Sequence, residues 1–266
     1  MDRVLTLRLE SVGCAAEAVL NGFPLGRTPK GGGVLTLAVH EYTVSGANRL
    51  SLVVEPHALQ PGFEQAQPRL HLSDATSMAS LRLLLTNVGR PSTAQEAHVL
   101  AQLEWVSPSG EMITLPHTVE HQVHLPINFP RWRWIDLPIL PEPEAVRQPI
   151  VELLQGIALS LSKGQAEGFI VAAKLRFEEL ALAYQRDLQS ELALFRAEIQ
   201  RAHAEEPLRV ELPTAQMQLR RCVDGRLLEC LGPDGLPALR TTNASGRVRM
   251  WPVRIAIIDE RAYVLR

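Results

Sequence analysis

The stretch VLNGFPLGRT, residues 19–28, contains the strongest short signal for local structure in the chain. Asn21-Gly22 lies between two apolar segments, and this dipeptide favours the positive φ angles of a two-residue hairpin turn. We therefore predict a β-hairpin here. Similar runs of alternating apolar and polar residues surround it, beginning with VLTLRLESV, and Gly, Pro, Asn and Ser separate them. Many short strands with regular turns predict an antiparallel β-sandwich in the N-terminal half.

Residues 4–56 resemble the galactose-binding-like β-sandwich domains found beside many glycosidases. Those domains have a hairpin of the form LNG…LG, then a strand, then G-x-N-x-L leading into the next strand. The resemblance implies a fold for residues 1–138. It implies no sugar-binding residue, because the binding loops of these domains vary freely. The matching residues are Asn21, Gly22, Gly26, Gly46, Asn48 and Leu50.

The pattern changes at WIDLPILPEPEAVRQP, where four prolines fall in one short stretch. Neither a helix interior nor a central strand tolerates such a cluster, so we place a domain boundary there. The predicted domains are therefore residues 1–138 and residues 139–266. The prolines are Pro138, Pro141, Pro143 and Pro149.

In the second domain, apolar residues recur at helical spacing over 145–204, with a break at Lys163-Gly164. Strands return over 208–266. Helices followed by an antiparallel meander predict an α+β domain with helices packed on a sheet. This order of elements resembles that of NTF2-like folds, which often enclose a pocket.

The stretch PHTVEHQVHLP contains His117, Glu120 and His121 in the pattern H-x-x-E-H, the zinc signature of one class of metalloproteases. On a helix the two histidines share a face and the glutamate activates water. The resemblance to that class also implies a downstream glutamate ligand, and Glu198 has a comparable separation. However, the stretch is short, bracketed by prolines and rich in β formers, so we expect an exposed edge strand.

The segment FPRWRWIDLP places Trp132 and Trp134 on one face of an extended chain. They are candidate ligand-binding residues, because an aromatic platform can bind a sugar or another flat ligand. The other interpretation is that both rings are buried and join the sandwich to the helical domain.

Three cysteines do not form a disulfide framework. If Asp224-Gly225 is a hairpin turn, Cys222 faces Leu227 and is out of register with Cys230. We therefore expect free, mostly buried thiols, which are typical of a reducing compartment.

Composition limits the classes of partner. The 266 residues have a net charge of −2, which gives no bulk attraction to nucleic acid or an anionic membrane. No apolar run approaches the ~20 residues of a membrane-spanning helix. The first residues, MDRVLTLRLESV, show no secretory signal, so we predict a cytoplasmic protein.

The sequence lacks G-x-S-x-G, a phosphate-binding loop and a cysteine in a recognisable nucleophile context. We therefore expect a non-enzymatic binding or accessory protein, without cofactor, whose partner is another protein and which could be of the immunity type. Two alternatives stay open. One is a carbohydrate-binding module using Trp132 and Trp134, and the other is a small zinc metallohydrolase using His117, Glu120 and His121.

Overall fold

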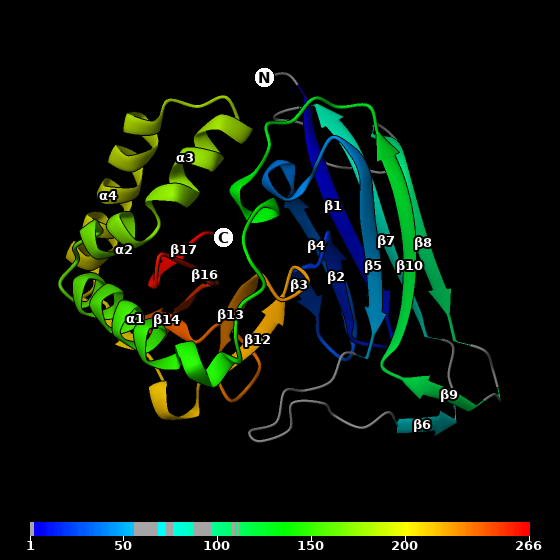
Figure 1. Ribbon diagram of the computed structural model, residues 1–266. Coiled ribbons are helices and arrows are strands. Elements are labelled where there is room, and N and C mark those ends of the chain that lie inside the picture. Colours follow the sequence, from blue (N-terminus) through cyan, green and yellow to red (C-terminus); the bar gives the residue numbers. More distant parts are fainter. Residues whose placement is uncertain (1–2, 56–68, 73–76, 88–96, 108–109, 111) are drawn as a thin grey trace. The chain divides into compact units, whose positions relative to one another are not determined.

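The computed structural model describes residues 3–55, 69–72, 77–87, 97–107, 110 and 112–266. Antiparallel sheet is the commonest regular structure of the described chain, with helices in the C-terminal half (Figure 1). The described residues form two compact units: the first extends to Arg131 and the second begins at Trp132. A two-domain protein divided at residues 138 and 139 stays a prediction.

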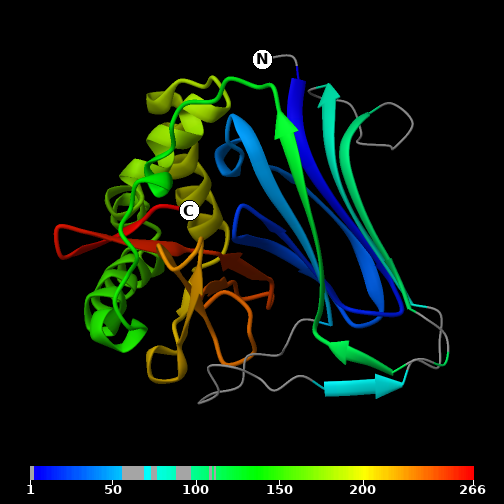
Figure 2. The same ribbon diagram turned by 45° about the vertical axis from the view of Figure 1, so that its right-hand side comes forward.

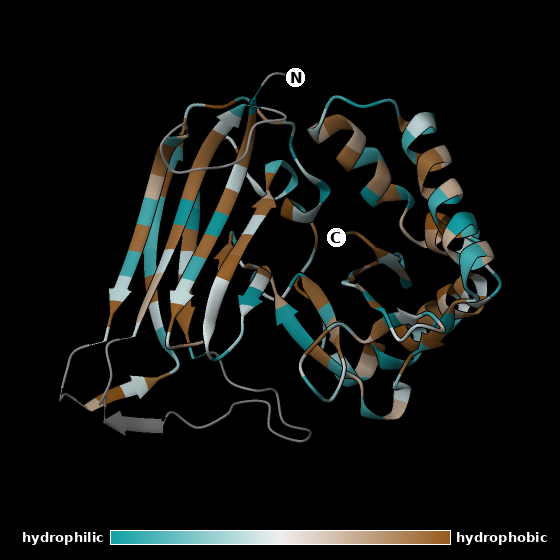
Figure 3. Ribbon diagram, turned by 180° about the vertical axis from the view of Figure 1, so that it is seen from behind, coloured by the Kyte–Doolittle hydropathy of each residue, from teal (hydrophilic) through white to brown (hydrophobic). Residues whose placement is uncertain are grey.

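The first unit contains two four-stranded antiparallel sheets, with strand orders β4-β1-β7-β8 and β10-β5-β2-β3. Both sheets place alternate residues, such as Leu7, Leu52 and Leu81, in one shared core. The two layers can be followed in Figure 2, and the alternation of hydropathy along the strands in Figure 3. The unit is therefore sandwich-like, as the period-two pattern predicted. Its strands and 3-10 helix are β1 (Arg3–Val12), β2 (Ala16–Leu20), β3 (Phe23–Thr28), β4 (Gly32–Ala38), η1 (His40–Tyr42), β5 (Gly46–Val54), β6 (Arg69–Leu72), β7 (Met78–Asn87), β8 (His98–Val106), β9 (Met112–Leu115) and β10 (His117–Leu125), with β6 and β9 forming a small separate sheet.

The predicted hairpin between β2 and β3 is confirmed. Asn21 and Gly22 form its two-residue loop with φ angles of 51° and 80°. The Asn21 amide donates to Oδ1 of Asn48 at 2.8 Å, and this oxygen also accepts from the backbone N–H of Val44 at 2.9 Å. The Asn48 amide in turn donates to the carbonyls of Val44 and Gly46 at 2.8 and 3.0 Å. The two asparagines that support the resemblance therefore hold the hairpin to the start of β5.

The second unit has two antiparallel sheets, with strand orders β11-β14-β15 and β12-β13-β16-β17. Four helices pack with alternate strand residues, such as Leu228 and Ile255, in the core of the unit. Its elements are η2 (Arg133–Ile135), η3 (Pro143–Val146), α1 (Arg147–Ser162), α2 (Glu167–Ala172), α3 (Lys174–Ala183), α4 (Leu188–Glu205), β11 (Arg209–Glu211), η4 (Thr214–Gln216), β12 (Gln218–Cys222), β13 (Leu227–Leu231), β14 (Leu239–Thr242), β15 (Val248–Trp251), β16 (Arg254–Ile258) and β17 (Arg261–Val264).

Helix α1 ends where the sequence predicted a break. The backbone N–H of Lys163 and of Gly164 bonds to the carbonyls of the last turn. Gly164 has a φ of +69°, and a Cβ there would lie 2.6 Å from Cγ of His203 in α4. Only glycine combines this conformation with so close an approach.

The later apolar stripe, from Phe169 to Ile199, is not continuous as a helix. Ala173 separates α2 from α3, and Gln185, with a φ of +53°, lies in the loop that separates α3 from α4. The apolar spacing of four and three continues across these breaks, which is why periodicity alone did not reveal them.

The proline-rich segment is bonded to the β12–β13 hairpin. The backbone N–H of Leu140 donates to the carbonyl of Gly225 at 2.9 Å. Arg221 donates to the carbonyls of Leu140 and Pro141 at 3.0 and 2.8 Å, and Arg226 donates to the carbonyl of Leu137. This segment therefore belongs to the packed structure of the second unit.

None of the helices in the described ranges combines the length and apolar character that crossing a membrane requires.

Candidate functional site

Helix α4, with 18 residues, begins at a side-chain cap. Asp187 precedes it in an extended conformation, and Oδ2 of Asp187 accepts a hydrogen bond from the backbone N–H of Ser190 at 2.7 Å. A carboxylate here satisfies an N–H group that a helix start leaves unpaired. This backbone bond also lowers the pKa of Asp187.

One face of α4 packs into an aromatic cluster. The ring centroid of Phe195 lies 5.3 Å from those of Phe169 in α2 and Phe177 in α3, and 6.0 Å from that of Trp251 in β15. The Trp251 indole N–H donates to Oγ1 of Thr241 at 3.0 Å. Aromatic pairs stabilise beyond the area that they bury, so this cluster fixes the orientation of α4.

Over its first three turns, the opposite face of α4 is exposed and uncharged. Arg201, whose side chain is 74% exposed, follows on the same face and lies 4.0 Å from Glu205. Leu194 has 66% of its surface exposed. The solvent-facing side of a helix is normally charged or strongly polar, so this face departs from the usual pattern. We define the α4 surface as the exposed residues Gln189, Ser190, Ala193, Leu194, Ala197 and Gln200.

Ion pairs border the α4 surface on both sides, given the helical spacing of 100° per residue. Each of these charges is paired with a residue outside the surface. The hydrogen bond from Arg196 also lowers the pKa of Glu167. The pairs are Arg186–Glu191 at 3.3 Å, Arg249–Glu198 at 2.6 Å and Arg196–Glu167 at 2.9 Å.

The histidine stretch forms strand β10, as the β formers predicted. His117, His121 and Glu120 are exposed, and Glu120 accepts a hydrogen bond from Oγ of Ser51 at 2.9 Å. Residues four apart on a strand lie about 13 Å apart, so the zinc geometry that requires a helix is not formed here. Among the described residues, no three His, Cys, Asp or Glu side chains are grouped to hold a metal ion.

Glu198, the further ligand of that zinc hypothesis, lies in α4 and forms the ion pair with Arg249. Trp132 and Trp134 lie at the start of the second unit and are 1% and 7% exposed. A platform for a flat ligand needs exposed ring faces, so the buried rings give the carbohydrate-binding interpretation no support.

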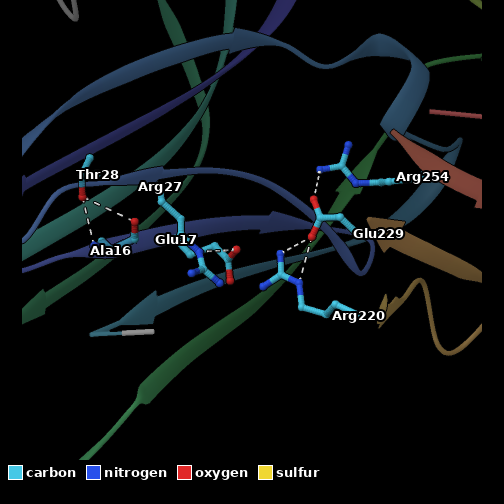
Figure 4. A network of polar contacts seen from close by, with 7 residues as sticks. All are labelled: Ala16, Glu17, Arg27, Thr28, Arg220, Glu229 and Arg254. Atoms are coloured by element: carbon cyan, nitrogen blue, oxygen red, sulfur yellow. Dashed lines mark hydrogen bonds and ion pairs between the residues drawn. The ribbon is translucent and has the colours of Figure 1, made fainter. Parts of the chain in front are cut away.

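A row of buried charges was not found by sequence reasoning. In the β12-β13-β16-β17 sheet, Glu229 lies opposite Arg220 on one neighbouring strand and Arg254 on the other. Oε2 of Glu229 accepts from Nε of Arg220 at 2.9 Å, and Oε1 accepts from Nη2 of Arg254 at 3.0 Å (Figure 4). Glu229 and Arg254 are 6% and 4% exposed. A buried carboxylate requires such partners, so this row is structural.

The signal for this row was present in the sequence. Cys222 lies opposite Leu227, as the Asp224-Gly225 turn predicted, and the same register places Arg220 opposite Glu229. The loop itself has four residues, since β12 ends at Cys222 and β13 begins at Leu227.

A second buried carboxylate, Glu179 of α3, is bonded by residues far along the chain. Nη1 of Arg266 donates to its Oε2 at 2.5 Å, and the backbone N–H of Arg133 donates to its Oε1 at 2.8 Å. Glu179 and Arg266 are 4% and 1% exposed. No local pattern indicates this pair, because 87 residues separate its members.

The three cysteines are free and buried, as predicted. Burial raises the pKa of the Cys222 thiol to about 12, and burial likewise raises the pKa values of Cys230 and Cys14. A thiol that resists ionisation is a poor nucleophile, so these positions are suited to packing.

The α4 surface is thus a feature of the described chain that packing within its own unit does not explain. Known proteins give no guide to its role: no family model matches the chain, and no curated protein or solved structure is significantly similar to it.

Proposed function

We propose that this chain is a non-enzymatic binding protein and that the α4 surface is where it binds another protein. The supporting observation is that every exposed residue of α4 from Gln189 to Gln200 is uncharged, with paired charges at the border of this surface. Protein interfaces have the same composition, with charges depleted at the centre and polar residues at the rim. A helix face built only for contact with water gains nothing from excluding charge.

The side chains of the surface indicate the shape of the partner. Ala193 and Ala197 are one turn apart and leave the backbone accessible, which allows a second helix to approach within the usual 8–10 Å. Leu194, beside them, presents an apolar side chain to fill a gap between residues of that helix. The partner we propose therefore presents an amphipathic helix with an apolar stripe.

The aromatic cluster below the surface supports this role. Binding costs less free energy when the binding element is already ordered. Phe195 and Ile199 fix α4 on its inner side, so its outer face is ordered before a partner arrives.

Our proposal also covers the fold of each domain and the cellular location. We propose a galactose-binding-like domain over 1–138 and an NTF2-like domain over 139–266. The asparagine-supported hairpin favours the first, and helices that precede antiparallel strands favour the second.

A cytoplasmic location is supported by the free thiols. Immunity-type neutralisation of a partner is one role that such a protein could have.

Site-specific photocrosslinking in cells that produce the protein tests this function. A photoreactive phenylalanine analogue replaces Ala197 in one variant and Leu159 in a matched control. Leu159 is an equally suitable helical position, since it lies in α1 and is 58% exposed. We expect a discrete crosslinked species from position 197 that the control lacks. Identical crosslinking patterns from the two positions, or no species from position 197, contradict the proposal.

A further inference from the structure

Strand β10 is the edge strand of its four-stranded sheet, and Trp105 of β8 approaches it at His117, with ring centroids 6.3 Å apart. It pairs with β5 along its whole length, from His117 opposite Val54 to Leu125 opposite Gly46. Among the described residues, no strand pairs with its other side. An open edge presents N–H and C=O groups that another strand can pair with.

The residues of β10 do not protect this edge. Natural edge strands usually include lysine, proline or a bulge that prevents pairing with another chain. Between His117 and Leu125 there is no lysine, arginine or proline, and Glu120 is the one acidic residue. The pairing of β10 with β5 is regular and has no bulge.

The sequence of β10 is complementary to itself when reversed. His121 is the central residue of HTVEHQVHL. If a second copy runs antiparallel with the two central histidines opposite each other, Val119 faces Val123 of the other copy. In the same register Glu120 faces Gln122, and Thr118 faces His124. Each of these pairs is favourable or neutral, because β-branched residues pack together and an amide can donate to a carboxylate.

The two faces of the strand agree with this register. Val119 and Val123 are half-buried and pack against the core of the sandwich on one face. Glu120 and Gln122 are exposed on the other. Antiparallel pairing keeps opposite residues on the same face, so the valines of the two copies would extend the apolar side and the polar residues would stay on the outside.

We propose that two copies of this chain associate through β10, antiparallel, with the two-fold axis at His121. The pairing joins the β10-β5-β2-β3 sheets of the two copies into one continuous sheet. A two-fold axis between the two central histidines gives the simplest closed, isologous arrangement for identical subunits. This inference concerns the first unit and does not depend on the function of the α4 surface.

Opposite charge changes at one position provide the first test. In each copy Gln122 faces Glu120 of the other copy, so Gln122→Lys creates two attractive pairs and Gln122→Glu creates two repulsive ones. We expect the dimer dissociation constant, measured by sedimentation velocity, to change by roughly tenfold in each direction.

The same substitutions should change the stability of the single copy in the opposite direction from the affinity of the dimer, so the two effects can be distinguished. Position 122 lies opposite Arg49 of β5. Gln122→Glu therefore slightly stabilises the single copy while it weakens the dimer, and Gln122→Lys does the reverse. Melting curves recorded beside the sedimentation data show whether a loss of dimer comes from a loss of fold.

Disulfide formation tests the register directly. Opposite residues on antiparallel strands have Cα atoms ~4.5–5.5 Å apart, within the range that a disulfide spans. His121→Cys should thus give a covalent dimer with diamide as the oxidant. His124→Cys is the matched control, because the two copies of position 124 would be ~20 Å apart. The three native cysteines are buried, and the wild-type protein gives the background level of covalent dimer.

The expected result is a wild-type dimer, opposite shifts for the two Gln122 variants, and crosslinking at position 121 but not at position 124. A protein that is monomeric at its highest soluble concentration overturns the proposal. So does a dimer that both Gln122 variants leave unchanged, or crosslinking at position 124 in place of 121.

Discussion

In the second unit, Glu229 and Arg254 are buried and paired in one row with the half-buried Arg220, whereas the exposed residues of α4 from Gln189 to Gln200 are all uncharged. This reverses the usual distribution of charge between interior and surface. The difference shows what each region is built to contact. The buried charges are already paired within the protein, and the neutral exposed face has no partner among the described residues of its own unit.

The two regions should therefore respond differently to substitution. A buried ion network costs free energy to assemble, and removing one member leaves another charge buried without compensation. A solvent-exposed helix residue contributes little to folding, so changes there alter what the helix can bind.

The largest effect is expected at Glu229. Glu229→Ala leaves Arg254 buried without its carboxylate partner and should lower the free energy of unfolding by ~3–5 kcal/mol. Chemical denaturation measures this loss. The matched control is Glu198→Ala, which breaks the exposed pair with Arg249 and should cost about 1 kcal/mol or less. Equal losses for the two variants would show that burial does not distinguish these pairs.

A neutral buried group should have an intermediate effect. Asn48 is 1% exposed and bonds to Asn21, Val44 and Gly46. Asn48→Ala removes these bonds and leaves half-buried backbone groups of Val44 and Gly46 without them, which should cost about 1–3 kcal/mol. The same denaturation experiment measures it. A loss as large as that of Glu229→Ala would mean that hydrogen bonding, and not charge, determines the sensitivity of buried polar groups.

The smallest effect on stability is expected on the α4 surface. Leu194→Gln exchanges an exposed apolar residue for a polar residue that also favours helix, so the free energy of unfolding should change by less than about 0.5 kcal/mol. Thermal melting and denaturation both measure it. A loss above ~2 kcal/mol would show that Leu194 packs within the protein and would remove it from the proposed binding surface.

Local features of this fold could be predicted from the sequence. Asn21-Gly22 predicted a hairpin because few residue pairs adopt two positive φ angles, and Lys163-Gly164 predicted the end of α1 for a similar reason. The β formers between two prolines predicted that the histidine stretch is a strand.

Features that depend on distant residues could not be predicted. Glu179 pairs with Arg266 only because α3 and the residues after β17 are adjacent in the fold. The α4 surface was also missed. Its uncharged residues are visible in the sequence, but the ion pairs that border them join residues far apart in the chain, such as Glu198 and Arg249.

The claim that the α4 surface binds a partner protein is tested most directly by an affinity measurement with the species captured by photocrosslinking. Titration calorimetry would compare the wild-type protein with Ala197→Glu and with Leu159→Glu as the control, all three having similar melting curves. Removing a carboxylate from water at an interface centre is costly, so we expect Ala197→Glu to weaken binding about tenfold or more, with Leu159→Glu close to wild type. Wild-type affinity in Ala197→Glu would contradict the account.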